Sequence, residues 1–373
     1  MNNTLATKTG NLTDDWTVNQ GLSSAVCILL AVIMIGTLII GTIGNTLVLA
    51  LFIKYKSLRT ASNIFIASLT IADLMMCLCG LPALINNYLL VKMEPNSAEF
   101  ICYSDTFIGA FTGFGAIWSL MALAVDRCVV ITRSMPVQHP TDKMIAYFVT
   151  ATIWIVALAF AMMPFLGFGR YSIEGSKIAC SVINFTKSFS NMLYNILIQV
   201  LYFFIPIICM ICCYSIIFIK VRTHERQYFN VKQSGQVDDS SFRRMRKSRK
   251  LERNEMKTAR AGLILISVFC LSWTPYSIVS WIGLLGNRYT LTPLAVALPA
   301  VFAKMSTILN PLLYALLLRS FKLKLRLLYK QHFQLTRNFN VASERTHVEF
   351  ISNLDGRRRE AADRTRRKNL SSL

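Results

Sequence analysis

Charged residues are scarce in this sequence, and acidic residues are much scarcer than basic ones. Only 16% of the 373 residues are charged, 54% are hydrophobic, and 40 lysines and arginines outnumber 19 acidic residues. Soluble domains carry about 25% charged residues, so the composition argues against an ordinary soluble protein. The four histidines are scattered, and no set of cysteines and histidines suggests a metal site.

The apolar residues are gathered into seven runs that are almost free of charge. A bilayer-spanning helix needs about 20 mostly apolar residues, whereas barrel strands would alternate over about 10 residues. The sequence therefore predicts an all-α membrane protein built as a bundle of seven transmembrane helices. The predicted spans are residues 24–53, 63–91, 101–132, 144–169, 190–219, 261–285 and 294–318.

Basic residues are concentrated in alternate loops. The loop between spans five and six contains "RRMRKSRKLER" (243–253), and the C-terminal tail contains "GRRREAADRTRRK" (356–368). The positive-inside rule then places the N-terminus outside and the C-terminus in the cytoplasm of a multi-pass plasma-membrane protein. The expected target of the basic runs is anionic lipid, at about 1 kcal/mol per residue, or an acidic partner surface, and no nucleic acid is expected. Residues 1–22 lack the pattern of a cleavable signal peptide.

Several residues on the predicted outer side are candidates for covalent modification. Asn2, Asn11 and Asn184 begin N-x-S/T sequons, which predict glycosylation. Cys102 lies at the outer end of span three and Cys180 lies in the loop after span four. Because this compartment is oxidising, a disulfide between them would hold the loop across the mouth of the bundle.

Lys304 is the least expected residue of the seventh span. It lies in "VFAKMSTILNPLLY" (301–314), about ten residues or ~15 Å from the outer end, where a charge costs roughly 2.5–3.5 kcal/mol. Desolvation favours the neutral amine, which can condense with an aldehyde to a Schiff base. A protonated imine needs a carboxylate, and the candidates are Asp105, Asp73 and Glu174. A helical Cβ leans toward its N-terminus, which favours Asp105 over Asp73.

Three prolines interrupt the last three spans. Each proline removes the helical hydrogen bond to the carbonyl four residues earlier and tends to kink its helix. The kinks are consistent with hinges for a signal across the membrane, and equally with irregular packing. The prolines are Pro206, Pro275 and Pro311, and the freed carbonyls belong to Tyr202, Leu271 and Thr307.

The order and spacing of the motifs resemble a rhodopsin-like (class A) G-protein-coupled receptor over about residues 24–330. The motifs are Asn45 in span one, "LTIAD" ending at Asp73, "DRC" at 126–128, "FCLSWTP" at 269–275 and "NPLLY" at 310–314. More narrowly, the chain resembles an animal opsin of a non-vertebrate or non-visual type. Lys304 stands six residues before Asn310, where opsins carry the lysine that binds retinal.

The resemblance implies a retinal site, with 11-cis retinal or another isomer bound to Lys304. It implies two counterion positions, and acids stand at both, Asp105 and Glu174, so the working counterion stays open. The positions implied to line the retinal pocket are Trp273, Tyr276, Gly113 and Phe203. Plain core packing explains the last two equally well.

The resemblance also implies an activation switch and its partners. Arg127 is expected to pair with Asp126 and Glu255 in the inactive state, with Tyr214 and Tyr314 bracing the active one. The pocket and the switch would be linked through Asp73, Asn45, Asn310 and Pro311. The partners implied are a heterotrimeric G protein, arrestin and a receptor kinase. "DRC" in place of "DRY" leaves the acidic and basic residues intact.

The expected function is therefore a light-sensing receptor and not an enzyme. The alternatives are a retinal photoisomerase and a class A receptor for a diffusible ligand. The expected parts are an extracellular tail (1–23), the receptor domain (24–318), an amphipathic membrane-surface helix (319–330) and a disordered cytoplasmic tail (331–373).

Overall fold

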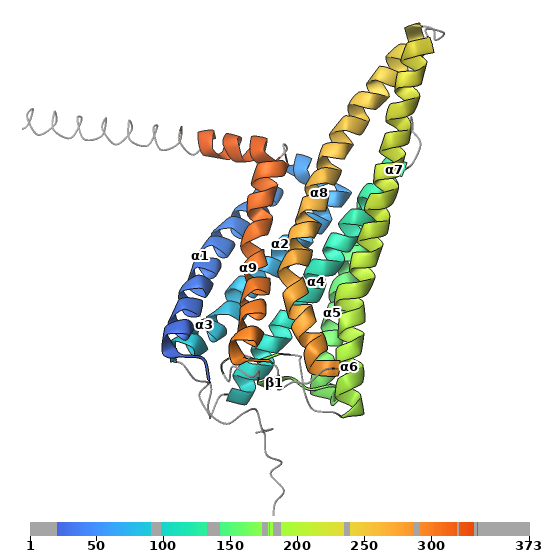
Figure 1. The fold of residues 1–373 in the computed structure, drawn as a ribbon. Helices are drawn as coiled ribbons and strands as arrows, with labels where there is room; N and C mark the ends of the chain where they lie inside the picture. Colours follow the sequence, from blue (N-terminus) through green and yellow to red (C-terminus); the bar gives the residue numbers. More distant parts are fainter. Residues whose placement is uncertain are drawn as a thin grey trace, which may run out of the picture. The chain divides into compact units, whose positions relative to one another are not determined.

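The computed structural model describes most of the chain between residues 21 and 334. The described ranges are 21–90, 98–132, 142–173, 178, 180–181, 188–234, 239–285, 291–318, 321–331 and 334. The chain divides into two units, residues 1–319 and 320–373. The first unit holds all the elements labelled in Figure 1, and in the second unit residues 321–331 are helical.

The first unit is a bundle of long helices. In the described residues, seven helical segments are long and apolar enough to cross a membrane, which confirms the predicted fold class. The segments are α1 (Ser24–Lys54), α2–η2–α3 (Ala61–Met75, Met76–Gly80, Leu81–Leu90), α4 (Ala98–Thr132), α5–η3 (Lys143–Met162, Met163–Leu166), α6–η4–α7 (Phe189–Gln199, Val200–Phe204, Ile205–Ser234), α8 (Asp239–Leu285) and α9 (Pro293–Leu317). A short 3₁₀ turn, η1 (Lys56–Leu58), follows α1.

Polar side chains fix where several helices begin. At each of these N-caps a hydroxyl or carboxylate oxygen accepts a hydrogen bond from a backbone N–H of the first turn, which would otherwise lack a partner. At the other end of a segment, Gly167 stops η3 with φ +84°, a conformation that glycine adopts readily. The N-capping residues are Ser23, Thr60, Asp142, Ser188 and Thr292.

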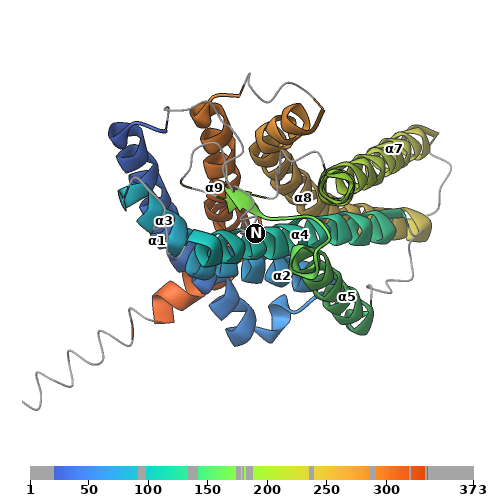
Figure 2. The ribbon, with the colours of Figure 1, turned by 90° about the horizontal axis from the view of Figure 1, so that it is seen from below.

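Helix α4 is the central helix of the bundle. It packs against α2, α5, α7 and α8, while α9 packs against α1 and α8, and Figure 2 shows α4 crossing the middle of the bundle. Many large apolar side chains, such as Ile43 and Ile211, point outward and are exposed. An outward apolar surface of this extent suits contact with lipid.

A small hairpin lies near one end of the bundle. Strands β1 (Ser172–Ile173) and β2 (Cys180–Ser181) pair antiparallel, with Ile173 opposite Cys180, and both strands contact α4. Hydropathy did not predict this hairpin, because two-residue strands leave no periodic pattern.

The predicted effect of Pro311 is visible in the hydrogen bonds around α9. Pro311 cannot donate to the Thr307 carbonyl, and the side-chain nitrogen of Asn45 donates to that carbonyl at 3.1 Å. The same Asn45 nitrogen donates to Gly41 of its own helix at 2.9 Å. The freed carbonyl therefore joins α9 to α1.

Candidate functional site

Lys304 and Asp105 form an ion pair inside the bundle. The Nζ atom of Lys304, on α9, donates to Oδ1 and Oδ2 of Asp105, on α4, at 3.1 and 3.3 Å. Their side chains are only 14% and 5% exposed. Among the described residues this is the single ion pair of Lys304, and burial makes such a pair strongly dependent on both partners.

The other two acids proposed for Lys304 have different positions. Asp73 is buried on α2 and accepts a hydrogen bond from Asn310 Nδ2 at 2.7 Å. Glu174 lies outside the described residues. Of the described carboxylates, the structure therefore brings Asp105 and not Asp73 to Lys304.

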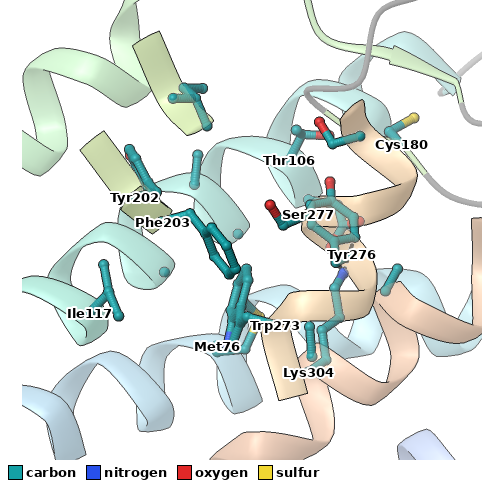
Figure 3. A pocket seen from close by; sticks show the side chains of 18 of the residues that line it. Met76, Thr106, Ile117, Cys180, Tyr202, Phe203, Trp273, Tyr276, Ser277 and Lys304 are labelled. Carbon is teal, nitrogen blue, oxygen red and sulfur yellow. Dashed lines mark hydrogen bonds and ion pairs between the residues drawn. The ribbon is translucent and has the colours of Figure 1, made fainter. Parts of the chain in front are cut away.

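The ion pair opens onto an interior cavity that is lined mainly by α3, α4, α6, η4, α8 and α9. The cavity measures about 1100 Å³, counting the open space at its mouth. Figure 3 shows Lys304 beside Tyr276, with Trp273 and Phe203 on the neighbouring walls. All four positions that the sequence assigned to a pocket, Trp273, Tyr276, Gly113 and Phe203, line this cavity.

Aromatic side chains shape the floor of the cavity. Trp273 stacks on Phe269, with ring centroids 5.4 Å apart, and meets Tyr276 edge-on at 6.2 Å. A Cβ atom added to Gly113 would stand 3.2 Å from Cη2 of Trp273. The glycine therefore lets the indole lie directly against α4.

These residues fit a long, apolar ligand that ends in an aldehyde. The amine of Lys304 can form an imine, Asp105 can balance a positive charge on that nitrogen, and the aromatic walls can pack on a flat conjugated chain.

A second polar cluster lies on α4 and α2, away from the cavity. Arg127 Nη2 pairs with Asp126 Oδ2 at 2.8 Å, and Ser62 donates a hydrogen bond to the same carboxylate. The side chain of Glu255, the other predicted partner of Arg127, lies outside the described residues. The Tyr214 hydroxyl of α7 lies against Gly262 of α8.

Three of the predicted network residues, Asn45, Asp73 and Asn310, form hydrogen bonds between helices. Asn310 donates to Asp73, as above, and Asn45 reaches the Thr307 carbonyl that Pro311 frees. Tyr314, on the same helix, is fully buried. The structure thus links α1, α2 and α9 through side-chain hydrogen bonds.

The predicted modification sites are described only in part. Cys180 is disulfide-bonded, and the side chain of its expected partner, Cys102, lies outside the described residues. The sequon residues Asn2, Asn11 and Asn184 also lie outside them.

Comparison with known proteins identifies the family. The family described as "7 transmembrane receptor (rhodopsin family)" matches residues 44–314. The lateral eye opsin of Limulus polyphemus is 31% identical over 77% of this chain and 75% of its own length. The chain belongs to the opsins. Its family makes it a multi-pass membrane receptor.

Further relatives of this opsin are melanopsins and rhodopsins. The melanopsin of Branchiostoma belcheri is 34% identical over 76% of this chain, and a crystal structure of squid rhodopsin superposes with a TM-score of 0.76 at 28% identity, covering 86% of this chain and 91% of that one. The opsin spans only 39% of the Branchiostoma protein and 51% of melanopsin-B of Xenopus laevis.

Sequence reasoning missed one polar feature of the opsin's cavity. Ser277 Oγ, on α8, donates to Gln199 Oε1, on α6, at 2.7 Å, and both residues are buried in the cavity wall. A glutamine within the apolar run 190–219 was the available signal, because an amide in a span needs a buried partner.

Proposed function

We propose that this opsin is a light-sensing G-protein-coupled receptor that holds retinal, as the 11-cis or another isomer, on Lys304 through a protonated Schiff base. The observation that carries the proposal is the Lys304–Asp105 pair, which is buried in an aromatic cavity. When bound, retinal supplies light absorption and a light-driven change of shape.

Asp105 is proposed as the counterion. Its carboxylate lies within 3.3 Å of Lys304 Nζ from both oxygens, so it can hold a proton on that nitrogen against the cost of burial. Glu174 is proposed as a supporting acid on the outer loop. An acid at either position favours a positively charged nitrogen and therefore absorption in the visible range.

Trp273 is proposed to pass the signal from the cavity to α8. It lines the cavity, packs against Gly113 of α4, and stands two residues before Pro275, which lies inside α8. A push on the indole would act next to the one turn of α8 that lacks a helical hydrogen bond. A bias of a few kcal/mol is enough to shift such a two-state element.

The Arg127–Asp126 pair is proposed as the latch of the inactive state, with Glu255 as its second partner. Opening α8 would expose Arg127 to a G protein, while Tyr214 and Tyr314 brace the open form. We propose the Gq class, because a relative from Mizuhopecten yessoensis is a rhodopsin described as Gq-coupled. Arrestin and a receptor kinase are proposed to act on the tail, residues 331–373.

The proposed setting is the plasma membrane. The tail 1–23 would be extracellular and glycosylated, Cys102 would be the disulfide partner of Cys180, and residues 319–330 would form a helix on the cytoplasmic membrane surface.

The decisive experiment adds 11-cis retinal to the purified apoprotein and records the absorption spectrum. We expect a visible band in the wild type, no band in Lys304→Ala, and a shift toward the near ultraviolet in Asp105→Asn that is larger than in Glu174→Gln. Light-dependent nucleotide exchange on a G protein then separates a signalling receptor from a photoisomerase. A band that persists in Lys304→Ala would refute the proposed attachment.

A further inference from the structure

One wall of the cavity is more polar than an apolar chromophore requires. Four uncharged polar residues gather where α6 and α8 meet, on a different wall from Lys304 and Asp105, and all four line the cavity and are buried. We call this group the polar wall. It consists of Asn195 and Gln199 on α6 and Ser277 and Ser280 on α8.

Internal hydrogen bonds satisfy only part of the polar wall. Ser277 Oγ donates to Gln199 Oε1 at 2.7 Å, and Asn195 Nδ2 donates to the Asn191 carbonyl at 3.0 Å. Among the described residues, the remaining amide nitrogen of Gln199, the amide oxygen of Asn195 and the hydroxyl of Ser280 have no hydrogen-bond partner. If the Gln199 amide were turned over, one of its polar atoms would still be free.

The free groups define the chemistry that would satisfy them. An amide nitrogen donates, an amide oxygen accepts, and a serine hydroxyl does both. A ligand hydroxyl can donate and accept at once, so it matches this mixture, whereas a ketone can only accept. A charged ligand group is disfavoured, because Lys304 and Asp105, the two charged residues among the described residues of the lining, already neutralise each other.

We propose that the polar wall is a hydrogen-bonding subsite, and that the preferred chromophore of this opsin is a retinal that carries a hydroxyl group on its ring, away from the aldehyde. The inference rests on the proposed function, because it takes Lys304 as the attachment point. An unsubstituted ring would cover the free groups without bonding them, and buried polar groups without partners disfavour binding. Figure 3 shows Ser277 between Tyr276 and Phe203, which places the subsite among the aromatic walls.

The test is a competition between two chromophores. Purified apoprotein is given equal amounts of 11-cis retinal and 11-cis 3-hydroxyretinal, and the bound fraction is extracted and measured by chromatography. We expect the hydroxylated compound in about tenfold excess, which is the net effect of roughly one hydrogen bond. Equal uptake of both compounds would overturn the inference, since water would then serve the polar wall equally well.

Two variants and one matched control assign the preference to the polar wall. Gln199→Leu and Ser280→Ala should each reduce the excess several-fold while still forming a pigment, which shows that the protein is folded. Ser272→Ala is the control: it makes the same change on α8, but its hydroxyl donates to the Val268 carbonyl and does not line the cavity. An excess that survives in both polar-wall variants, or falls equally in the control, would contradict the subsite.

The design separates this inference from the function on which it rests. A Lys304-dependent pigment with no preference leaves the light-sensing proposal intact and removes only the subsite. Absence of any pigment with either compound removes both.

Discussion

The buried pair of Lys304 and Asp105 should be visible as an energetic coupling even without a chromophore. At 3.1 Å two unit charges attract by roughly 5 kcal/mol at an effective dielectric constant of 20. Desolvation of both groups offsets much of this gain. Removing only one partner should lower the free energy of unfolding by more than the intact pair contributes, because it leaves the other charge buried and uncompensated.

The perturbation is a double-mutant cycle of Asp105→Asn, Lys304→Met and the combined variant. We expect Asp105→Asn to lower the free energy of unfolding by about 3–5 kcal/mol, which corresponds to a fall of roughly 6–10 °C in Tm. The combined variant should return to within about 1–2 kcal/mol of the wild type, because no lone charge remains. We expect a similar loss for Lys304→Met, so the two single losses should together exceed the loss in the combined variant by at least about 4 kcal/mol, and this excess is the coupling energy.

The assay is thermal unfolding of the purified apoprotein in detergent, followed by a thiol-reactive dye. Lys143→Met is the matched control, because Lys143 is exposed at the start of α5 and its loss should change stability by less than about 0.5 kcal/mol. If each single variant cost under about 1 kcal/mol and the costs simply added, the pair would behave like one exposed to water. The reasoning about Lys304 would then be wrong.

Two further outcomes test the packing and the outer loop. Gly44→Ala should destabilise the protein by about 1–3 kcal/mol in the same unfolding assay, because the added Cβ would lie 2.9 Å from Cγ of Pro311. Gly36→Ala is the control and should not destabilise the protein, because its Cβ would have nothing within 4 Å. Equal effects of the two substitutions would contradict close packing of α1 on α9. Cys180→Ser should cost about 2–5 kcal/mol, and Cys102→Ser should match it; additive losses would show that the two cysteines are not bonded to each other.

The sequence predicted the seven spans well and the full helices less well. Span six was predicted to begin at residue 261, yet α8 begins at Asp239. Hydropathy detects the apolar part of a helix, whereas arginine, lysine and glutamate continue a helix outside the membrane. The π-helical turns η2 and η4 were also missed, because a single wide turn does not change the apolar pattern.

The centre of the site was more accessible to sequence reasoning than its periphery. The lean of helical Cβ atoms favoured Asp105 over Asp73 as the partner of Lys304, and the structure has that pairing. The Gln199–Ser277 bond could not be foreseen, because it depends on how α6 and α8 are rotated toward each other. The roles proposed for Glu174 and Glu255 stay predictions.

The carbonyl of Thr307 gives α9 a second attachment, in addition to its packing. One turn above it is Lys304, whose own carbonyl accepts the Thr307 hydroxyl at 3.0 Å, and one turn below it is Pro311. Because the nitrogen of Pro311 carries no hydrogen, the Thr307 carbonyl is free to accept a hydrogen bond from Asn45, which joins α1 to α9. The absence of an amide hydrogen at Pro311 therefore lets Asn45 attach the turn that bears Lys304 to α1, so a force on Lys304 would also act on α1.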